Sequence, residues 1–219
     1  MSPSSADAGA SPAATTAPRS PGCQLVVLTG GPGAGKTAVL ETVRRSFDKL
    51  VVLPDAAGIV FGGGFWRRPS LAGRKAVQRA IFHIQRELER LVAEEGAVPF
   101  ALCDRGTLDP LAYWPEEAAS FFTELGIERE AELLRYSAVI HLRTPAVDSR
   151  YDGQGPLHKE ELLAAQEIDE RIALAWQGHP NRVFIDSDAD FFGKTLRAIT
   201  QIKANLPSSY RERSAALGS

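Results

Sequence analysis

GGPGAGKT, residues Gly30–Thr37, is the most informative stretch of the chain. It fits the pattern G-x-x-x-x-G-K-[ST] in full, follows a short apolar run and opens a helix-forming segment. Gly30, Gly33 and Gly35 allow backbone conformations that a Cβ would prevent, so that backbone N–H groups can converge on a phosphate at the start of a helix. The pattern therefore predicts a loop that binds a nucleoside triphosphate; the alternative is a glycine-rich turn without a ligand.

Two side chains of this loop have specific expected roles. Lys36 is expected to bridge the β- and γ-phosphates, and the Thr37 hydroxyl is expected to ligate Mg²⁺. The predicted cofactors are therefore ATP, or GTP, together with Mg²⁺. The residues predicted to contact the nucleotide are Gly31, Gly33, Ala34, Gly35, Lys36, Thr37 and Ala38.

Short apolar runs alternate with helix-forming segments on both sides of the loop. Buried-strand patterns occur at 24–29, 50–53, 98–103, 138–142 and 182–185, and helical patterns occur at 35–47, 71–95, 159–177 and 190–206. Apolar strands that alternate with helices are typical of an α/β protein whose parallel sheet is covered on both faces. We therefore expect a three-layer α/β P-loop NTPase fold.

The two ends of the chain differ in composition from the rest. Residues 1–22 are almost all Ser, Ala, Pro, Thr and Gly, a composition that cannot bury enough surface to offset the entropy of ordering. The predicted organisation is a disordered tail over 1–22, a nucleotide-binding, kinase-like domain over 23–206 and a flexible C-terminal tail over 207–219.

Composition and charge exclude several classes of protein. The chain has 219 residues, a formal net charge of −2 and 44% hydrophobic residues, which is ordinary for a globular domain. The lack of a basic excess argues against a nucleic-acid partner, and no apolar run reaches the roughly 18 residues of a membrane helix. Cys23 and Cys103 form neither a CxxC pair nor a metal-spaced cluster. We expect a cytoplasmic monomer or homodimer.

The third apolar run ends in an Asp-Arg pair. In PFALCDRG, Asp104 stands at the carboxyl end of the predicted strand, where ligands bind in open α/β sheets, and it can hold Mg²⁺ there. Hydrolysing motor ATPases usually carry Glu after this Asp, whereas this chain has Arg105, which could contact a phosphate or an acceptor. The pair favours phosphoryl transfer to a bound acceptor, with a surface ion pair as the alternative. The NKxD motif of regulatory GTPases and the LSGGQ signature of transporter ATPases are both absent.

The acceptor side of the site is less clearly marked. Asp55 follows the second strand and could orient an acceptor hydroxyl, or it could simply cap the next helix. The segment FGGGFWRRPS could form a flap that grips the acceptor through Arg67, or a loop exposed to solvent. Gln78 and Gln85 are seven residues apart and share a helix face. We expect a solvated flank there, with recognition of an acceptor's polar edge as the alternative.

A lid over the γ-phosphate is expected after the fourth strand. Arg143 and Arg150 follow that strand, and the glycine-containing segment YDGQGPLHK leads into the next helix. Arg171 on this helix is the best candidate for a lid arginine that stabilises charge on the transferred group, and a surface ion pair with Asp169 or Glu167 is the alternative.

Four stretches between about residues 24 and 203 together resemble one family: GGPGAGKT, CDRGTLDPLAYW, YSAVIHL and LAAQEIDERIALAWQGHP. The chain is similar to the small P-loop ATPase/kinase family, with an AAA-type ATP-binding domain, that includes the nicotinamide-riboside kinase domain of the bacterial NAD-biosynthesis regulator and the TRPL translocation defect protein of flies. The resemblance implies an ATP- or GTP-binding domain with a five-stranded parallel sheet in the order 2-3-1-4-5. It fixes no substrate.

Residue by residue, the resemblance covers both ends of the site. The matched positions are the phosphate loop, the Asp-Arg pair Asp104 and Arg105, the later acid Asp109, and a motif on and after the lid helix with Asp169, Arg171, Trp176 and His179. Two positions depart from the family pattern. Asp55 stands where the family usually has Glu, which shortens the reach by one methylene, and His158 stands where a lid arginine is expected, so that Lys159 could supply the charge instead.

These observations predict a Mg²⁺-dependent kinase that transfers the γ-phosphoryl group to a small, hydroxyl-bearing, nucleoside-like metabolite. The predicted catalytic residues are Lys36, Asp55, Asp104 and Arg171; the predicted substrate contacts are Asp55, Arg67, Arg105 and Arg143; and the predicted metal ligands are Thr37 and Asp104. The alternative is an ATP- or GTP-dependent switch or scaffold that binds a protein or lipid partner and hydrolyses slowly.

Overall fold

The structure is a computed structural model that describes residues 23–47, 50–145, 159–187, 191–208 and 210. The N-terminal tail predicted at 1–22 lies outside these ranges, as do the lid positions Arg150 and His158. Tyr210, which the sequence placed in the C-terminal tail, packs against Phe100 and the core. The folded body therefore extends at least to Tyr210. Within the described ranges, no helix combines the length and the apolar character that crossing a membrane requires.

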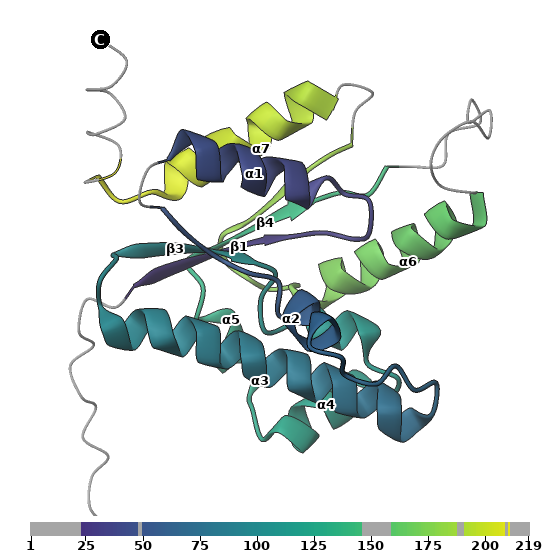
Figure 1. The fold of residues 1–219 in the computed structure, drawn as a ribbon. Coiled ribbons are helices and arrows are strands. Elements are labelled where there is room, and N and C mark those ends of the chain that lie inside the picture. The colour runs from purple at the N-terminus through teal and green to yellow at the C-terminus, as the bar shows by residue number, and fades with distance from the viewer. Residues whose placement is uncertain (1–22, 48–49, 146–158, 188–190, 209, 211–219) are drawn as a thin grey trace, which may run out of the picture.

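A five-stranded parallel sheet forms the centre of the fold (Figure 1). Its strands follow the order β2-β3-β1-β4-β5, and β1 pairs with both of its neighbours, so that Val27 lies opposite Cys103 on one side and Val139 on the other. The predicted α/β class, parallel pairing and strand order are confirmed. The strands are β1 (Gln24–Thr29), β2 (Val51–Leu53), β3 (Phe100–Asp104), β4 (Ala138–Leu142) and β5 (Arg182–Ile185).

Helices cover both faces of this sheet. Figure 1 shows α1 (Lys36–Ser46) and α7 (Phe191–Asn205) on one face, and α3 (Leu71–Glu95) and α6 (Lys159–Ala175) on the other. Alternate residues of β1 belong to different hydrophobic clusters: Val26 packs with α1 and α7, whereas Val27 packs with the opposite layer. The central strands β1, β3 and β4 therefore bury apolar residues on both faces of the sheet, which explains their continuous apolar runs.

The ends of the long helices follow their sequence signals. Ser70 caps α3 by accepting a hydrogen bond from the Gly73 N–H at 3.2 Å, and Gly96 ends the helix with a left-handed φ of 58°. The segment between β3 and β4 and the segment after β2 form short helices that the sequence did not predict. These are α2 (Ala56–Gly62), the 3₁₀ turn η1 (Asp109–Tyr113), α4 (Ala118–Leu125) and α5 (Arg129–Leu133).

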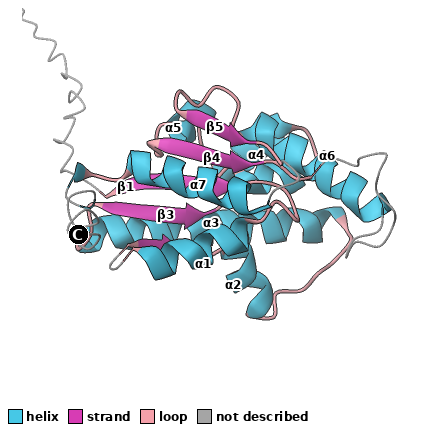
Figure 2. Cartoon of the chain, turned by 90° about the horizontal axis from the view of Figure 1, so that it is seen from above, coloured by secondary structure: helices cyan, strands magenta, loops and turns pink. Residues whose placement is uncertain are grey.

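The direction of the strands determines where the site lies. Figure 2 shows the strands running the same way, so their carboxyl ends share one edge of the sheet. The phosphate loop leaves β1 at this edge, Asp55 follows β2, and Asp104 ends β3. Three segments that are far apart in sequence are thereby brought to one edge, as expected for ligand sites in open α/β sheets.

Candidate functional site

The phosphate loop joins β1 to α1 and is held in place by β4 and α6. The Gly31 N–H donates a hydrogen bond to Asp169 Oδ1 at 2.8 Å, and the Thr144 hydroxyl donates to the Pro32 carbonyl at 3.2 Å. A Cβ on Gly31 would come within 2.5 Å of the Thr144 hydroxyl oxygen and 2.9 Å of the Ala165 carbonyl. The second glycine of the loop is therefore required because α6 and the segment after β4 approach it closely.

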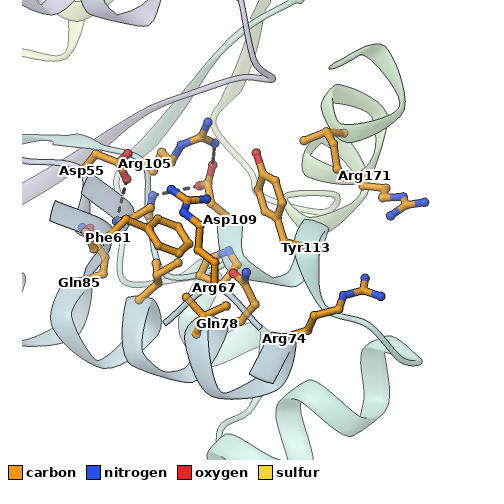
Figure 3. Close-up of a pocket in the computed structure, with 17 residues that line it drawn as sticks. Asp55, Phe61, Arg67, Arg74, Gln78, Gln85, Arg105, Asp109, Tyr113 and Arg171 are labelled. Carbon is orange, nitrogen blue, oxygen red and sulfur yellow. Dashed lines mark hydrogen bonds and ion pairs between the residues drawn. The ribbon is translucent and has the colours of Figure 1, made fainter. Parts of the chain in front are cut away.

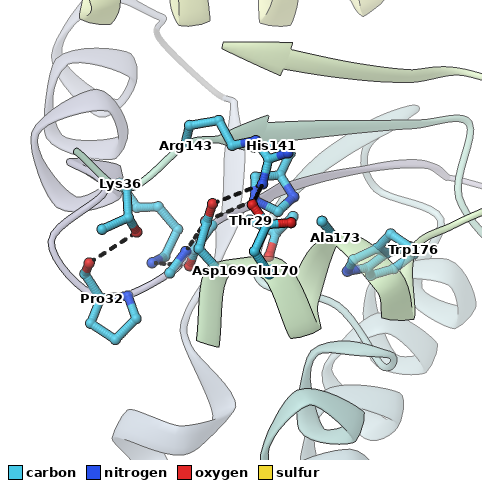
Figure 4. A network of polar contacts seen from close by, with 12 residues as sticks. Thr29, Pro32, Lys36, His141, Arg143, Asp169, Glu170, Ala173 and Trp176 are labelled. Carbon is cyan, nitrogen blue, oxygen red and sulfur yellow. Dashed lines mark hydrogen bonds and ion pairs between the residues drawn. The ribbon is translucent and has the colours of Figure 1, made fainter. Parts of the chain in front are cut away.

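Asp169 connects this loop to a buried polar cluster. Its carboxylate contacts His141 Nε2 at 2.9 Å and accepts a hydrogen bond from Arg143 at 3.1 Å, besides the bond from Gly31 (Figure 4). Burial raises the pKa of Asp169, but the hydrogen bonds and charge of His141, Gly31 and Arg143 outweigh it and hold the pKa at about 2. The carboxylate is therefore ionised at neutral pH and serves as a fixed anchor for the loop.

Lys36 opens α1 and points back across the loop. Its Nζ donates a hydrogen bond to the Gly30 carbonyl at 3.0 Å. Burial and, to a smaller extent, the nearby Arg105 lower the pKa of Lys36 to about 8, against the opposing effect of Asp104 and other carboxylates. A phosphate placed beside this ammonium would restore its preference for the charged form.

This depressed pKa predicts that nucleotide affinity depends on pH. Because bound phosphates favour the protonated lysine, binding above about pH 8 must take up a proton, and the Kd for MgATP should rise by up to about tenfold per pH unit. Titration calorimetry between pH 7.5 and 9.5, in two buffers of different ionisation enthalpy, would measure both the affinity and the proton uptake. The Lys36→Arg variant, whose guanidinium stays protonated, should show no such rise. A Kd that stays constant in the unmodified protein would contradict the prediction.

Asp104 presents a carboxylate oxygen that lacks a protein partner. Its Oδ1 is buried and forms no hydrogen bond within the described residues. Burial raises the pKa of Asp104, and Lys36 opposes that change, while Asp55 adds to it. An orphaned oxygen of this kind fits a Mg²⁺ ligand, since hard divalent cations take carboxylate oxygens directly or through water. Thr37, in the first turn of α1, supplies a hydroxyl oxygen that a hard divalent cation can also take.

A cavity of about 420 Å³ opens beyond Asp55 and Arg105, between α2, α3, η1 and α6 (Figure 3). Both of these residues are close enough to Lys36 to affect its pKa. Asp55 caps α2, because its Oδ1 accepts a hydrogen bond from the Ala57 N–H at 3.0 Å. Asp55 therefore both caps α2 and lines the cavity, so that a capping role and contact with an acceptor are compatible.

Arg105 and Asp109 form a rigid pair at the inner end of the cavity. Arg105 has a left-handed φ of 73°, and its guanidinium donates to Asp109 Oδ1 at 3.0 Å. Asp109 also accepts hydrogen bonds from the Thr29 hydroxyl, from the Gly106 N–H at 2.9 Å and from Trp176 Nε1 at 3.1 Å. This carboxylate is 2% exposed and its bonding capacity is filled, so it positions Arg105 and does not itself face a ligand.

The two glutamines of α3 form the floor of the cavity. Gln85 is 1% exposed and Gln78 is 8% exposed, and both line the cavity (Figure 3). The expectation of a solvated flank was therefore wrong, and its physical reason is that α2 and η1 cover this face of α3. The sequence signal for the burial of these glutamines was their position beside the apolar stripe of Val77 and Ile81.

Other predicted site residues are placed as follows. Arg67 lines the cavity and lies over the Phe61 ring, with its Cζ 3.6 Å from the ring centroid, and Arg171 lines the cavity from α6. Arg143 does not line it; its guanidinium pairs with Asp169 and Glu170 and lies over Phe184. The sequence did not single out Phe61 and Tyr113 as separate cavity residues, although both line it.

His179 and Trp176 are buried and serve the fold. The His179 Nδ1 accepts a hydrogen bond from the Asn181 N–H at 3.1 Å, so its Nε2 carries the proton toward the Tyr136 carbonyl at 2.9 Å. Trp176 packs against Tyr136 and donates to Asp109. These two residues, which follow α6 in the sequence, therefore support the fold around the site without lining its cavity.

Comparison with known sequences identifies the type of domain. Residues 25–193 match the family described as "AAA domain". The chain has no significant match among curated proteins.

Comparison with solved structures gives low sequence identity but a shared fold. One match is "Crystal structure of NadR protein in complex with NR", with a TM-score of 0.58, 16% identity and 83% of this chain covered. The chain spans about half of that protein, 51% of its length. A second match is the thymidylate kinase of Candida albicans, with a TM-score of 0.50, 13% identity and coverage of 84% of this chain and 92% of that chain.

Proposed function

The chain belongs to the AAA-domain family, and from this premise we propose that it is a Mg²⁺-dependent kinase that transfers the γ-phosphoryl group of ATP to a small, hydroxyl-bearing, nucleoside-like metabolite. The family's P-loop domain implies nucleotide binding. The observation that carries the kinase proposal is the cavity of about 420 Å³ that adjoins the phosphate loop through Asp55 and Arg105. A hydrolase needs only water at this position, whereas a cavity of this volume suits a small metabolite.

The residues at the inner end of the cavity can perform different parts of the reaction, namely proton transfer and stabilisation of charge. In transfer, the bond from the acceptor oxygen to the γ-phosphorus forms while the bond to the β–γ bridging oxygen breaks, and ADP leaves. Asp55 uses Oδ1 for the α2 cap, which leaves Oδ2 to orient the acceptor hydroxyl and take its proton before release to solvent. Lys36 and Arg105 supply positive charge for the transferred group. The predicted lid residue Arg171 lines the cavity from α6, where it is available to the acceptor.

A bound Mg²⁺ ion would neutralise charge on the phosphates, and Thr37 and Asp104 are the residues that would hold it. The orphaned Oδ1 of Asp104 supports this assignment. The structural neighbours support the fold and the kinase-like arrangement of the domain, and the cavity supports the presence of an acceptor.

The direct test is ADP release from MgATP, with and without a panel of nucleosides, nicotinamide riboside, sugars and aminoglycosides. We expect strong stimulation by one acceptor class, and we expect Asp55→Ala to lower the stimulated rate by about 10²-fold or more while the affinity for ATP stays within about twofold. The matched control is Glu94→Ala, which removes an exposed carboxylate from the far end of α3.

Two results would count against the proposal. A stimulated rate in Asp55→Ala equal to that of the unmodified protein would remove Asp55 from the reaction. Tight ATP binding with slow ADP release that no small compound changes would instead support the alternative, a nucleotide-dependent switch or scaffold whose partner is a protein or lipid.

A further inference from the structure

The charges that line the acceptor cavity are unequal. Four arginines and two carboxylates line it, and one of each, Arg105 and Asp109, are joined in a direct ion pair. The remaining carboxylate, Asp55, lies at the end nearest the phosphate loop, and the other three lining arginines are Arg67, Arg74 and Arg171. The part of the cavity away from the phosphate loop is therefore strongly positive.

Two of these arginines converge on the outer end of the cavity. Figure 3 shows the guanidinium groups of Arg74, from the first turn of α3, and Arg171, from α6, turned toward the same side. Within the described residues, neither forms a hydrogen bond or an ion pair. Both also line an adjoining hollow with Glu116 and Glu117, but the carboxylate of Glu116 is taken by Lys75. Both side chains are exposed to solvent, so their charges are available to an anionic ligand that enters the outer end of the cavity.

The floor of the same cavity carries two unsatisfied hydrogen-bond acceptors. The Oε1 atoms of Gln78 and Gln85 are buried and have no partner within the described residues. The orientation of the Gln85 amide is fixed, because its Nε2 donates to Glu89 Oε1 at 2.8 Å. Glu89 also accepts hydrogen bonds from Tyr136 and Arg135, so it has no proton to donate. Gln85 therefore offers a carbonyl oxygen to the cavity, and burying such a group unpaired is costly unless a ligand donor meets it.

From these two observations we propose that the acceptor is anionic: a nucleotide-like molecule whose phosphate or carboxylate is held by Arg74 and Arg171 and whose polar ring donates a hydrogen bond to Gln78 and Gln85. Paired arginines match a phosphate or carboxylate in geometry and charge. The proposal rests on the proposed kinase function and narrows its substrate class. A neutral nucleoside would gain no charge-assisted contact with the arginine pair, and a cationic one would be repelled.

The cavity also orders the parts of such an acceptor. The carboxylate of Asp55 stands at the end nearest Lys36, so this end suits a hydroxyl and repels an anion. The arginine pair stands at the outer end. The reacting hydroxyl and the anionic group of the acceptor are therefore on different parts of the molecule, with the ring between them over the glutamines.

The experiment measures binding and turnover separately, on the full chain with Mg²⁺ and a non-hydrolysable ATP analogue. Calorimetry compares each nucleoside with its 3′-monophosphate, its 5′-monophosphate and its 5′-carboxylate. We expect at least one anionic form to bind about tenfold tighter than its parent nucleoside, and the two sources of charge are distinguished by the phosphate and carboxylate arms. In Arg74→Gln and Arg171→Gln this preference should fall by about tenfold, with unchanged affinity for the ATP analogue.

Arg79→Gln is the matched control, because Arg79 lies on α3 but pairs with Glu124 outside the cavity, and it should keep the preference. Equal or tighter binding of every neutral nucleoside would overturn the anionic acceptor, as would a preference that both cavity variants retain. The kinase function has its own readout in ADP release. Stimulation of ADP release by a neutral nucleoside would support the kinase function and contradict the anionic acceptor. Arginine-dependent binding of an anion without ADP release would support an anion site and contradict the kinase function.

Discussion

Replacing Lys36 with alanine is expected to reduce phosphoryl transfer by about 10³-fold or more, and at the same time to make the nucleotide-free protein more stable. The loss of rate follows because a preorganised ammonium at the transferred group is among the largest contributions an active site makes. The gain in stability follows from the depressed pKa, which falls from 10.5 to about 8 in the folded state. Holding the lysine charged at neutral pH therefore costs about 3 kcal/mol of folding free energy.

Both effects are measurable on one pair of proteins. ADP release reports the rate, and urea unfolding at pH 7 without nucleotide reports the free energy of unfolding. Lys75→Ala is the control, since Lys75 lies on α3 and pairs with Glu116 and Glu124 away from the phosphate loop. Turnover in Lys36→Ala comparable to that of the control would refute the assigned role, and a destabilised Lys36→Ala would refute the energetic account of the loop.

Replacing Asp109 with alanine is expected to lower the free energy of unfolding by about 3–5 kcal/mol. The substitution removes the acceptor for the Thr29 hydroxyl, the Gly106 N–H and Trp176 Nε1, and it leaves the buried guanidinium of Arg105 without its counterion. Asp109 belongs to η1, which contacts α6 and α3, so the loss reaches the layer that forms the acceptor cavity.

Urea unfolding again supplies the measurement for Asp109. The same experiment on Glu94→Ala, which breaks an exposed ion pair with Arg90, should show a change of less than about 1 kcal/mol. Asp109→Asn keeps the shape of the side chain but replaces one acceptor oxygen with a donor, so it should fall between the two. An Asp109→Ala protein as stable as the Glu94→Ala control would show that the hydrogen bonds around Asp109 contribute little.

The fold and the phosphate end of the site follow from local sequence patterns. The apolar strand, the glycine spacing and the helix start at Lys36 all lie within one short segment, so one pattern contains the whole loop. The strand order came from the resemblance and not from periodicity. The short helices α2, α4 and α5 and the turn η1 escaped prediction because each is too brief to show a helical period and is stabilised by its contacts with α3 and with the core.

The acceptor end could not be read from local patterns. Gln78 looks like a surface residue on an isolated helix, and it is buried only because segments distant in the sequence cover it. Asp169 was expected in a lid motif, whereas its main contacts are with the phosphate loop and β4. Arg143 is predicted to contact the substrate, but its guanidinium pairs with Asp169 and Glu170. Those contacts could not be recognised from the sequence, because they depend on how α6 packs beside the end of β4.

The contacts that hold the phosphate loop limit how well it could be transferred to another protein. The glycine pattern of Gly30–Thr37 suggests a self-contained cassette, yet Gly31 depends on Asp169, Pro32 on Thr144, and Gly30 on the space beside the Leu142 carbonyl. Moving these eight residues into another parallel sheet would transfer the sequence motif alone. The contacts from α6 and from the segment at the end of β4, which hold the loop backbone in place, would be lost. The smallest transplantable unit in this protein is the loop together with both of those elements.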